Sequence, residues 1–348
     1  MTWTPLLVAL VAAVAAPDAR LRPDRVYYGI GNPLMVQVEV ADPAAVALVL
    51  MEADGTLLAP PRAVTPGPVD VGVLVPECLK PPAIGRTCYL QCMVDGEPAG
   101  SALVFQPMLS RRAPRTEQAQ RPDGTPYTRI VGWGPADPQD EPQRVFTGLR
   151  VYQEQDVVLH TTLGKIVVAM RPDEAPNTVW NFLRLVDGGF YDGVVFHRVV
   201  PLTRQGHPFV IQGGDPTGTG EGEPGYWLPI EPSELTHEFG VISMARADDP
   251  DSAGSQFFFC LSRAGTARLD GQYCAFGEAV DGAGTIRAIA DVELADVSTG
   301  RPAEPPVIIE ALLVPAPPRI PGEGRPDRPL AETRPHPPAA TQPDRVPR

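Results

Sequence analysis

The sequence reads FHRVVP at Phe196–Pro201, PFVIQGGDPTGTG at Pro208–Gly220 and GSQFFF at Gly254–Phe259. GVISMA at Gly240–Ala245 lies between the second and third of these segments, and LDGQY at Leu269–Tyr273 follows them. Most of these segments are short apolar runs that carry one or two polar side chains, as expected for strands that border a groove on one face. The order of the five segments, more than any one of them, determines how the chain is interpreted.

Polar side chains on these apolar runs are candidates for a site. Arg198 lies on a strand that is otherwise largely apolar, so its charged side chain should face a groove or solvent. Side chains alternate along residues 256–260, so one set can line a groove while the other fills a core. An apolar recess can be formed by Phe209, Val210, Phe258 and Leu269, with neutral donors and acceptors at Gln212 and Gln256.

Taken together, these segments resemble the cyclophilin-type peptidyl-prolyl isomerases. The resemblance covers about residues 155–314 and includes VLHTTLGKI at Val158–Ile166 and APNTVWNF at Ala175–Phe182. It implies cis–trans isomerisation of Xaa-Pro bonds, with proline-containing polypeptides as partners. Catalytic roles are implied for Arg198, which would polarise the prolyl amide, and for Phe209 and Gln212. Substrate-binding roles are implied for Val210, Ala245, Gln256, Phe258, Leu269 and Tyr273.

The chain departs from the family pattern at four places. An insertion, LTRQGHP at Leu202–Pro208, is longer than the usual short turn and is expected to alter how Phe209 enters the pocket. Arg268 stands where a tryptophan often precedes LDG, and Tyr273 replaces the groove histidine of eukaryotic members. Arg246 replaces the asparagine that often follows SMA, as in the bacterial-type members.

The reaction implied by the resemblance needs neither a nucleophile nor a metal. Amide resonance sets a rotation barrier of about 18–20 kcal/mol, so a catalyst must bind the twisted amide more tightly than either planar isomer. We therefore expect no cofactor and no metal, and no cysteines and histidines show zinc-ligand spacing. Two alternatives remain open: a non-catalytic module that binds proline-containing segments, or an adhesion or docking role carried by the front of the chain.

The fold expected for residues 155–314 is mainly β. Strands are expected at 157–162, 165–170, 194–200, 209–212, 240–245, 256–261, 273–280 and 307–314. Val179, Phe182, Leu183 and Val186 recur at helical spacing and predict one helix over 175–186, and a second helix is expected at 284–290. This pattern predicts a closed antiparallel β-barrel with two helices, of the kind that the resemblance implies.

Other parts of the chain differ in composition from the barrel segment. Residues 20–107 alternate short apolar runs with turn signals such as Asp54-Gly55 and Asp95-Gly96, which predicts a small β-sandwich domain of unknown role. Residues 108–154 are rich in proline and charged residues and are expected to be a linker. Residues 315–348 are Pro-rich and are expected to be a disordered tail.

Residues 1–19 have the pattern of a secretory signal peptide. The apolar run Leu6–Ala16 contains the small-x-small sequence Ala13-Val14-Ala15, and it is shorter than the roughly 20 residues that span a bilayer. We therefore expect an exported protein, periplasmic or extracellular, without a membrane span and monomeric. The formal net charge of −13 argues against nucleic acid as a partner.

The five cysteines leave their pairing open. Cys88 and Cys92 share one face of a predicted strand but would lie about 13 Å apart, which is too far for a disulfide. Cys78 could reach either of them, and the odd total leaves at least one thiol unpaired.

Overall fold

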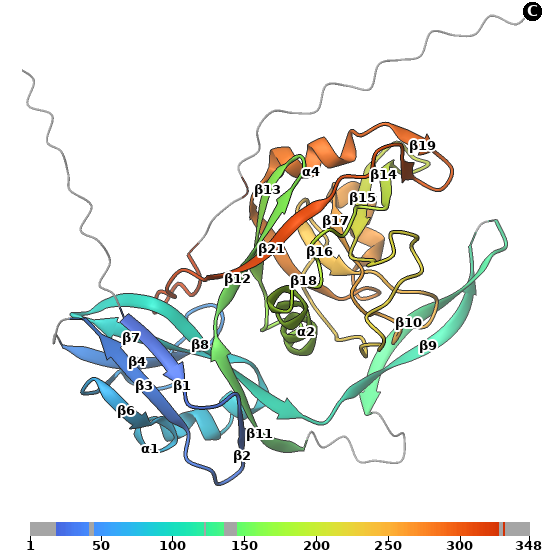
Figure 1. Ribbon diagram of the computed structural model, residues 1–348. Coiled ribbons are helices and arrows are strands. Elements are labelled where there is room, and N and C mark those ends of the chain that lie inside the picture. The colour runs from blue at the N-terminus through green and yellow to red at the C-terminus, as the bar shows by residue number, and fades with distance from the viewer. Residues whose placement is uncertain (1–18, 42–44, 122, 136–144, 327–329, 331–348) are drawn as a thin grey trace, which may run out of the picture. The chain divides into compact units, whose positions relative to one another are not determined.

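The computed structural model describes residues 19–41, 45–121, 123–135, 145–326 and 330 (Figure 1). The chain forms two compact units, each described here by itself. Unit 1 takes its described residues from Met1–Pro107, Thr147–Glu154 and Pro317–Pro326. Unit 2 takes them from Met108–Phe146, Gln155–Ala316 and Asp327–Arg348. The predicted signal peptide lies outside the described residues except for Ala19, the first residue of β1.

Unit 1 contains two antiparallel sheets. The smaller sheet has the order β1 (Ala19–Pro23), β3 (Met35–Val40), β6 (Gly67–Asp70). The larger has the order β2 (Tyr27–Gly29), β11 (Phe146–Gln153), β8 (Glu97–Leu109), β7 (Cys88–Val94), β4 (Val46–Met51), β5 (Arg62–Ala63). Three short helical segments, α1 (Val71–Leu74), η1 (Pro76–Leu79) and η2 (Ala83–Gly85), follow β6. Strand β1 contacts β7 across the sheets, and Leu21, Val36 and Val38 are buried. Two sheets in contact agree with the fold class predicted for residues 20–107, but the unit also takes in Thr147–Glu154, most of strand β11, and Pro317–Pro326.

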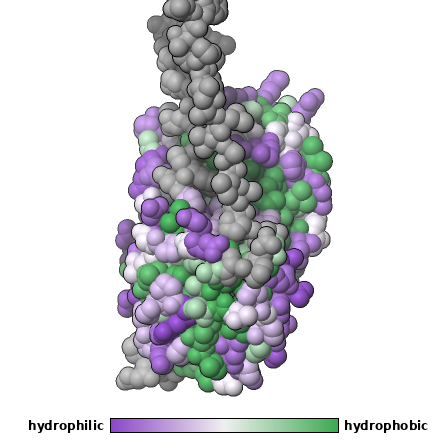
Figure 2. All heavy atoms as spheres, turned by 90° about the vertical axis from the view of Figure 1, so that its left-hand side faces the viewer, coloured by the Kyte–Doolittle hydropathy of each residue, from purple (hydrophilic) through white to green (hydrophobic). Residues whose placement is uncertain are grey.

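The surface of unit 1 carries both polar and apolar side chains. Figure 2 shows polar and apolar residues intermixed on the face that it displays. Among the exposed large apolar side chains of this unit are Ile30 and Val73, which are 70% and 77% exposed. Exposed apolar side chains of this kind are ordinary and do not by themselves mark an interface.

All five cysteines are buried and unpaired.

The described parts of residues 108–154, which are 108–121, 123–135 and 145–154, form strands and are not the linker that their composition predicts. Strands β9 (Arg112–Gln120) and β10 (Pro126–Pro135) pair as an antiparallel hairpin that belongs to unit 2, and β11 then returns to the larger sheet of unit 1. Most side chains of β9 are exposed. The two strands pair through their backbones, and this pairing does not require a buried face. Their sequences therefore lack the apolar alternation by which buried strands are recognised.

The expectation of a disordered tail is wrong for residues 315–326. Strand β21 extends to Pro315, and Arg319, in the segment that belongs to unit 1, is 1% exposed. Its guanidinium donates to both carboxylate oxygens of Glu154, at 2.9 and 2.8 Å, and lies 3.3 Å from the ring centroid of Tyr89. This ion pair and the hydrogen bond from the Gly322 N–H to the Gly55 carbonyl at 2.9 Å hold a segment whose Pro-rich composition predicts disorder. Residues 327–329 and 331–348 of the expected tail lie outside the described residues.

Unit 2 is built on an eight-stranded antiparallel sheet that curls on itself. Its two edges meet just before the edge strands, where Val195 bridges Val307 and the Phe196 N–H donates to the Pro306 carbonyl at 2.8 Å. The strand order is β14 (Arg198–Leu202), β15 (Pro208–Gly213), β17 (Phe257–Cys260), β16 (Val241–Met244), β18 (Ala275–Asp281), β13 (Gly164–Met170), β12 (Gln155–Thr161), β21 (Ile308–Pro315). The barrel class is as predicted, but a single bridge rather than a full ladder closes it.

Two helices of the expected kind accompany the barrel, at α2 (Pro176–Asp187) and α4 (Ala283–Ala290). Proline is tolerated at the first position of α2 because its N–H would be unpaired there in any case. The Phe182 ring on the buried face of α2 lies 5.6 Å from Phe257 and 5.1 Å from Phe276, so the predicted helical spacing fills the barrel core. The remaining elements are a one-turn α3 (Arg263–Thr266), η3 (Ala267–Leu269) and the pair β19 (Leu294–Asp296) and β20 (Arg301–Pro302).

No helix among the described residues is long and apolar enough to cross a membrane.

Candidate active site

The register of three neighbouring strands brings the predicted polar residues together. Arg198 on β14 pairs with Gln212 on β15, and Gln212 in turn pairs with Phe258 on β17. Directly opposed residues of an antiparallel pair project on the same face of the sheet. Residues up to 60 positions apart in the chain therefore share one patch on the barrel.

A directed chain of hydrogen bonds runs across this patch. The Gln256 amide Nε2 donates to the carbonyls of Gly220 and Gly222, both at 3.0 Å, and its Oε1 accepts from Gln212 Nε2 at 3.0 Å. The Gln212 Oε1 accepts from Arg198 Nη1, also at 3.0 Å. Backbone carbonyls can only accept, so they set the orientation of both amides. The chain ends by presenting an acceptor to the guanidinium of Arg198, which is exposed.

Asp215 fixes the loop at the other end of this chain. Its side chain is fully buried and accepts hydrogen bonds from Thr217 N–H at 2.6 Å, from Thr217 Oγ1 at 2.8 Å and from the Gly220 N–H. Burial alone would raise the pKa of Asp215, but the bonds from Thr217 and the loop N–H groups lower it to about 2. A Cβ at Gly222 would lie 2.0 Å from Asp215 Oδ1, which explains the glycine at that position.

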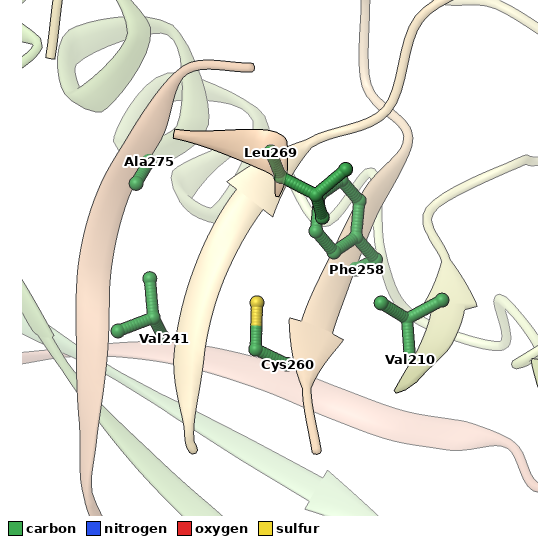
Figure 3. Packing of buried hydrophobic residues seen from close by; sticks show 6 residues of the cluster. All are labelled: Val210, Val241, Phe258, Cys260, Leu269 and Ala275. Carbon is green, nitrogen blue, oxygen red and sulfur yellow. The ribbon is translucent and has the colours of Figure 1, made fainter. Parts of the chain in front are cut away.

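An apolar cluster shares Phe258 with the strand register of the polar patch, and Figure 3 shows its six buried side chains. Its buried floor consists of Val210, Val241, Phe258, Cys260, Leu269 and Ala275. Phe209, Ala245 and Tyr273 are partly buried and pack against this floor. Six of the nine site residues predicted from the sequence are apolar or aromatic, and all six belong to this cluster. The other three, Arg198, Gln212 and Gln256, form the hydrogen-bond chain. Their individual roles stay predictions.

Two arginines cover aromatic side chains of the recess. The guanidinium of Arg268 lies 4.5 Å from the ring centroid of Phe209, and that of Arg246 lies 4.6 Å from that of Tyr273. Such pairs contribute about 0.5–1 kcal/mol at exposed sites. Both arginines are departures from the family pattern, and sequence reasoning did not predict that they contact the site.

The insertion at Leu202–Pro208 forms a tight turn between β14 and β15. Leu202 pairs with Pro208, and the Thr203 N–H donates to the His207 carbonyl at 2.7 Å. Gly206 has a φ of 80°, a conformation that favours glycine. Phe209 consequently enters the site from a regular strand.

Sequence reasoning missed His237, which supports Phe258 from behind. Its ring stacks on Phe258 with centroids 6.2 Å apart, and its nitrogens contact Asp270 Oδ1 at 2.9 Å and Ser243 Oγ at 3.0 Å. Burial lowers the pKa of His237, although Asp270 opposes the shift. No local pattern around residue 237 marks this role, because the contacts come from three separate segments. His197 is buried, as expected of a residue that alternates with Arg198.

Within the described ranges, no three histidine, cysteine, aspartate or glutamate side chains lie close enough together to hold a metal ion.

Comparison with known proteins identifies the barrel. The family model described as cyclophilin type peptidyl-prolyl cis-trans isomerase/CLD matches residues 156–313. The chain is 40% identical over 162 residues to the peptidyl-prolyl cis-trans isomerase ppi1 of Schizosaccharomyces pombe, covering 45% of this chain and 97% of that protein. It is 44% identical over 124 residues to a peptidyl-prolyl cis-trans isomerase of Synechococcus elongatus, covering 36% of this chain and 79% of that protein.

A solved structure is also similar. The cyclophilin type isomerase of Cryptosporidium parvum aligns with 30% sequence identity and a TM-score of 0.42, over 47% of this chain and 99% of that one. Since almost the whole length of the S. pombe relative is matched, the chain belongs to the cyclophilin-type peptidyl-prolyl cis-trans isomerases, and unit 2 carries its isomerase domain.

Proposed function

We propose that this isomerase accelerates the cis–trans interconversion of Xaa-Pro bonds in exported polypeptides while they fold. One observation carries the catalytic part of the proposal: an oriented guanidinium, Arg198, ends a hydrogen-bond chain whose strands also carry apolar cluster residues such as Phe209 and Phe258. The apolar run Leu6–Ala16, which lies outside the described residues, supports the exported location. Uncatalysed prolyl isomerisation takes tens to hundreds of seconds, which is slow enough to limit folding.

The mechanism follows from what happens to the amide as it twists. In the planar state the nitrogen lone pair is delocalised into the carbonyl, whereas in the twisted state it is localised and can accept a hydrogen bond. The recess receives the pyrrolidine ring, and an N–H of Arg198 donates to the prolyl nitrogen. This hydrogen bond is strongest in the twisted state, so it lowers the barrier instead of merely tightening substrate binding.

The charge on Arg198 is suited to this donation. Although part of the Arg198 side chain is exposed, the surrounding protein removes some of its solvation and so lowers the pKa of Arg198, and Tyr273 partly offsets that effect. A guanidinium nonetheless stays protonated in proteins, so it remains a donor with no acceptor lone pair. A hydrogen bond to a charged donor contributes about 1.5–3 kcal/mol, which corresponds to roughly 10–150-fold in rate.

A protease-coupled assay on a short Xaa-Pro peptide tests the catalytic part. Arg198→Ala is expected to lower kcat/KM by about 10–150-fold while peptide binding partly persists. Arg204→Ala is the matched control, because Arg204 is an exposed arginine on the turn that follows β14. Unchanged kcat/KM in Arg198→Ala would refute the assigned role.

Export is tested separately by expressing the full chain and measuring the mass of the accumulated protein in each cell fraction. We expect a mature form that lacks the segment up to about residue 19, recovered outside the cytoplasm. An uncleaved cytoplasmic protein would contradict the proposed location without affecting the isomerase assignment.

A further inference from the structure

A cavity beside the active site is formed in part by the β9–β10 hairpin. Its volume is about 360 Å³. Trp133 and Arg112 line it from the hairpin, residues 230–234 line it from a barrel loop, and Gly271 and Tyr273 line it from the segment that follows Leu269. We propose that this cavity is a specificity subsite of the isomerase, which receives an aromatic side chain of the polypeptide substrate near its proline.

Side chains of the barrel loops hold the hairpin against the barrel of unit 2. Asp248 accepts from both the backbone N–H and the hydroxyl of Thr128, at 2.9 and 2.8 Å. The Gln272 amide pairs with the backbone of Ile130, accepting its N–H at 2.9 Å and donating to its carbonyl at 3.0 Å. Ile130 is buried. The β10 strand is therefore anchored by two side chains on opposite sides of residue 129, so the hairpin forms a fixed wall.

Tyr273 belongs to both the cavity and the active site. Its ring meets that of Phe258 edge-on, with centroids 5.8 Å apart, and it packs against the floor of the recess. It also lines the cavity on the side of the hairpin. The ring of Tyr273 separates the cavity from the cluster around Phe258. An extended chain advances about 3.3 Å per residue, so two substrate residues on opposite sides of this ring are about two or three positions apart in the chain. A chain whose proline occupies the recess can therefore place a nearby side chain in the cavity.

The lining favours an aromatic occupant. Trp133 and Tyr273 present two aromatic rings, and Ile230 and Pro232 add apolar surface. A pair of aromatic rings contributes more binding energy than its buried area alone predicts. Tryptophan and tyrosine also carry a polar group that can stay hydrated at the edge of the ring. The volume falls at the lower end of the range found for small-ligand sites, and it accommodates one large side chain.

The charges of the lining do not favour a charged occupant. Arg112 and Glu234 are exposed and carry opposite charges, so neither sign predominates at the opening. Glu231 is engaged elsewhere: its carboxylate accepts from the backbone N–H and side chain of Asn177 and of Thr178, between 2.7 and 3.1 Å. It is therefore saturated and does not offer a site for a cationic side chain.

The proposal rests on the isomerase activity, which an alanine-flanked Ala-Pro peptide reports on its own. The experiment compares that peptide with a series that carries one phenylalanine or tyrosine at each position up to three residues either side of the Ala-Pro bond. At one or two positions the aromatic residue is expected to raise kcat/KM by about tenfold, through a lower KM. No position exceeding twofold would overturn the proposal.

Variants connect that preference to the cavity. Trp133→Ala is expected to reduce the aromatic preference to twofold or less and to leave the alanine-flanked peptide unaffected, while Trp133→Phe retains most of it. Trp227→Ala is the matched control, because Trp227 is 64% exposed and does not line the cavity. Equal losses in Trp133→Ala and Trp227→Ala, or a preference that survives in Trp133→Ala, would refute the assignment. Turnover of the alanine-flanked peptide shows that each variant is folded.

Discussion

Replacing Gln256 by glutamate tests whether the hydrogen-bond chain orients Arg198. The substitution keeps the shape of the side chain and the acceptor that faces Gln212. It removes the Nε2 group, which donates to the carbonyls of Gly220 and Gly222 at 3.0 Å each. A carboxylate oxygen then faces two carbonyl oxygens, and the loop that Asp215 braces is pushed away from the site.

The structure sets the scale of the effect. Each neutral hydrogen bond contributes about 1 kcal/mol, so losing both costs about 2 kcal/mol. Since 1.36 kcal/mol corresponds to a factor of ten in rate, full transmission of this loss to Arg198 would lower kcat/KM by about thirtyfold. Burial beside carbonyl groups raises the pKa of a carboxylic acid, and the protonated acid can donate to one of the carbonyls again. The activity of Gln256→Glu should therefore recover in part as the pH falls, whereas the parent protein should not show this recovery.

The measurement is kcat/KM for the alanine-flanked Ala-Pro peptide from about pH 5 to pH 8, a range that brackets a raised carboxyl pKa. Gln205→Glu serves as the control for added negative charge, because Gln205 is exposed on the turn between β14 and β15. A Gln256→Glu variant with the activity of the parent protein at the upper pH limit would refute the positioning argument. A uniformly low activity without recovery in acid would show that the substitution acts through some other route.

The remaining predictions concern stability and the recess. Hydrogen bonds hold the pKa of Asp215 at about 2, below its ordinary value of 3.8, so the carboxylate stabilises the fold by about 2 kcal/mol above pH 4, and this contribution is lost as the pH falls through 2. Urea unfolding across this range should show the slope in the parent protein and a shallower one in Asp215→Asn; equal slopes would contradict the assignment. Arg319→Met leaves the buried Glu154 carboxylate without its main partner and should lower the free energy of unfolding by about 3–5 kcal/mol, part of which the added substitution Glu154→Gln should restore in denaturant titrations. Arg268→Ala removes the cation above Phe209 and should raise KM by about two- to fivefold while Arg268→Lys does so less; a KM unchanged in both variants would show that this contact does not shape the recess.

The barrel elements, and the shared face of the candidate site residues, were predictable from local and periodic patterns, while the roles of those residues rest on the family resemblance and stay predictions. The apolar spacing around Phe182 predicts a helix over 175–186, and the structure has Pro176–Asp187. Alternation around Phe258 separates a groove face from a core face, and the register places Arg198, Gln212 and Phe258 on adjacent strands. In each case a pattern within a few residues reports directly on burial.

Tertiary contacts between distant segments left no such pattern. His237 reaches Phe258, Asp270 and Ser243 from a loop, and nothing in its neighbourhood distinguishes it from a surface histidine. Arg319 is also isolated: it is a single buried charge within a Pro-rich segment, and its partner Glu154 precedes it by 165 residues. Composition describes the average residue of a segment, whereas the contacts of a single residue such as Arg319, with Glu154, Gln91 and Ala53, depend on distant parts of the chain.

The β9–β10 hairpin shows why the same limit applies to specificity. A core strand must bury apolar side chains, so its sequence is constrained and recognisable. A strand that forms the wall of a substrate cavity needs only backbone pairing, a few anchors and one or two aromatic side chains directed at the substrate. Ile130, which Gln272 clamps, and Trp133, which lines the cavity, belong to the one apolar island in residues that otherwise have the composition of a linker. Such an island in a polar segment beside a catalytic domain therefore indicates a docked strand, and its aromatic member is the first residue to test for substrate selection.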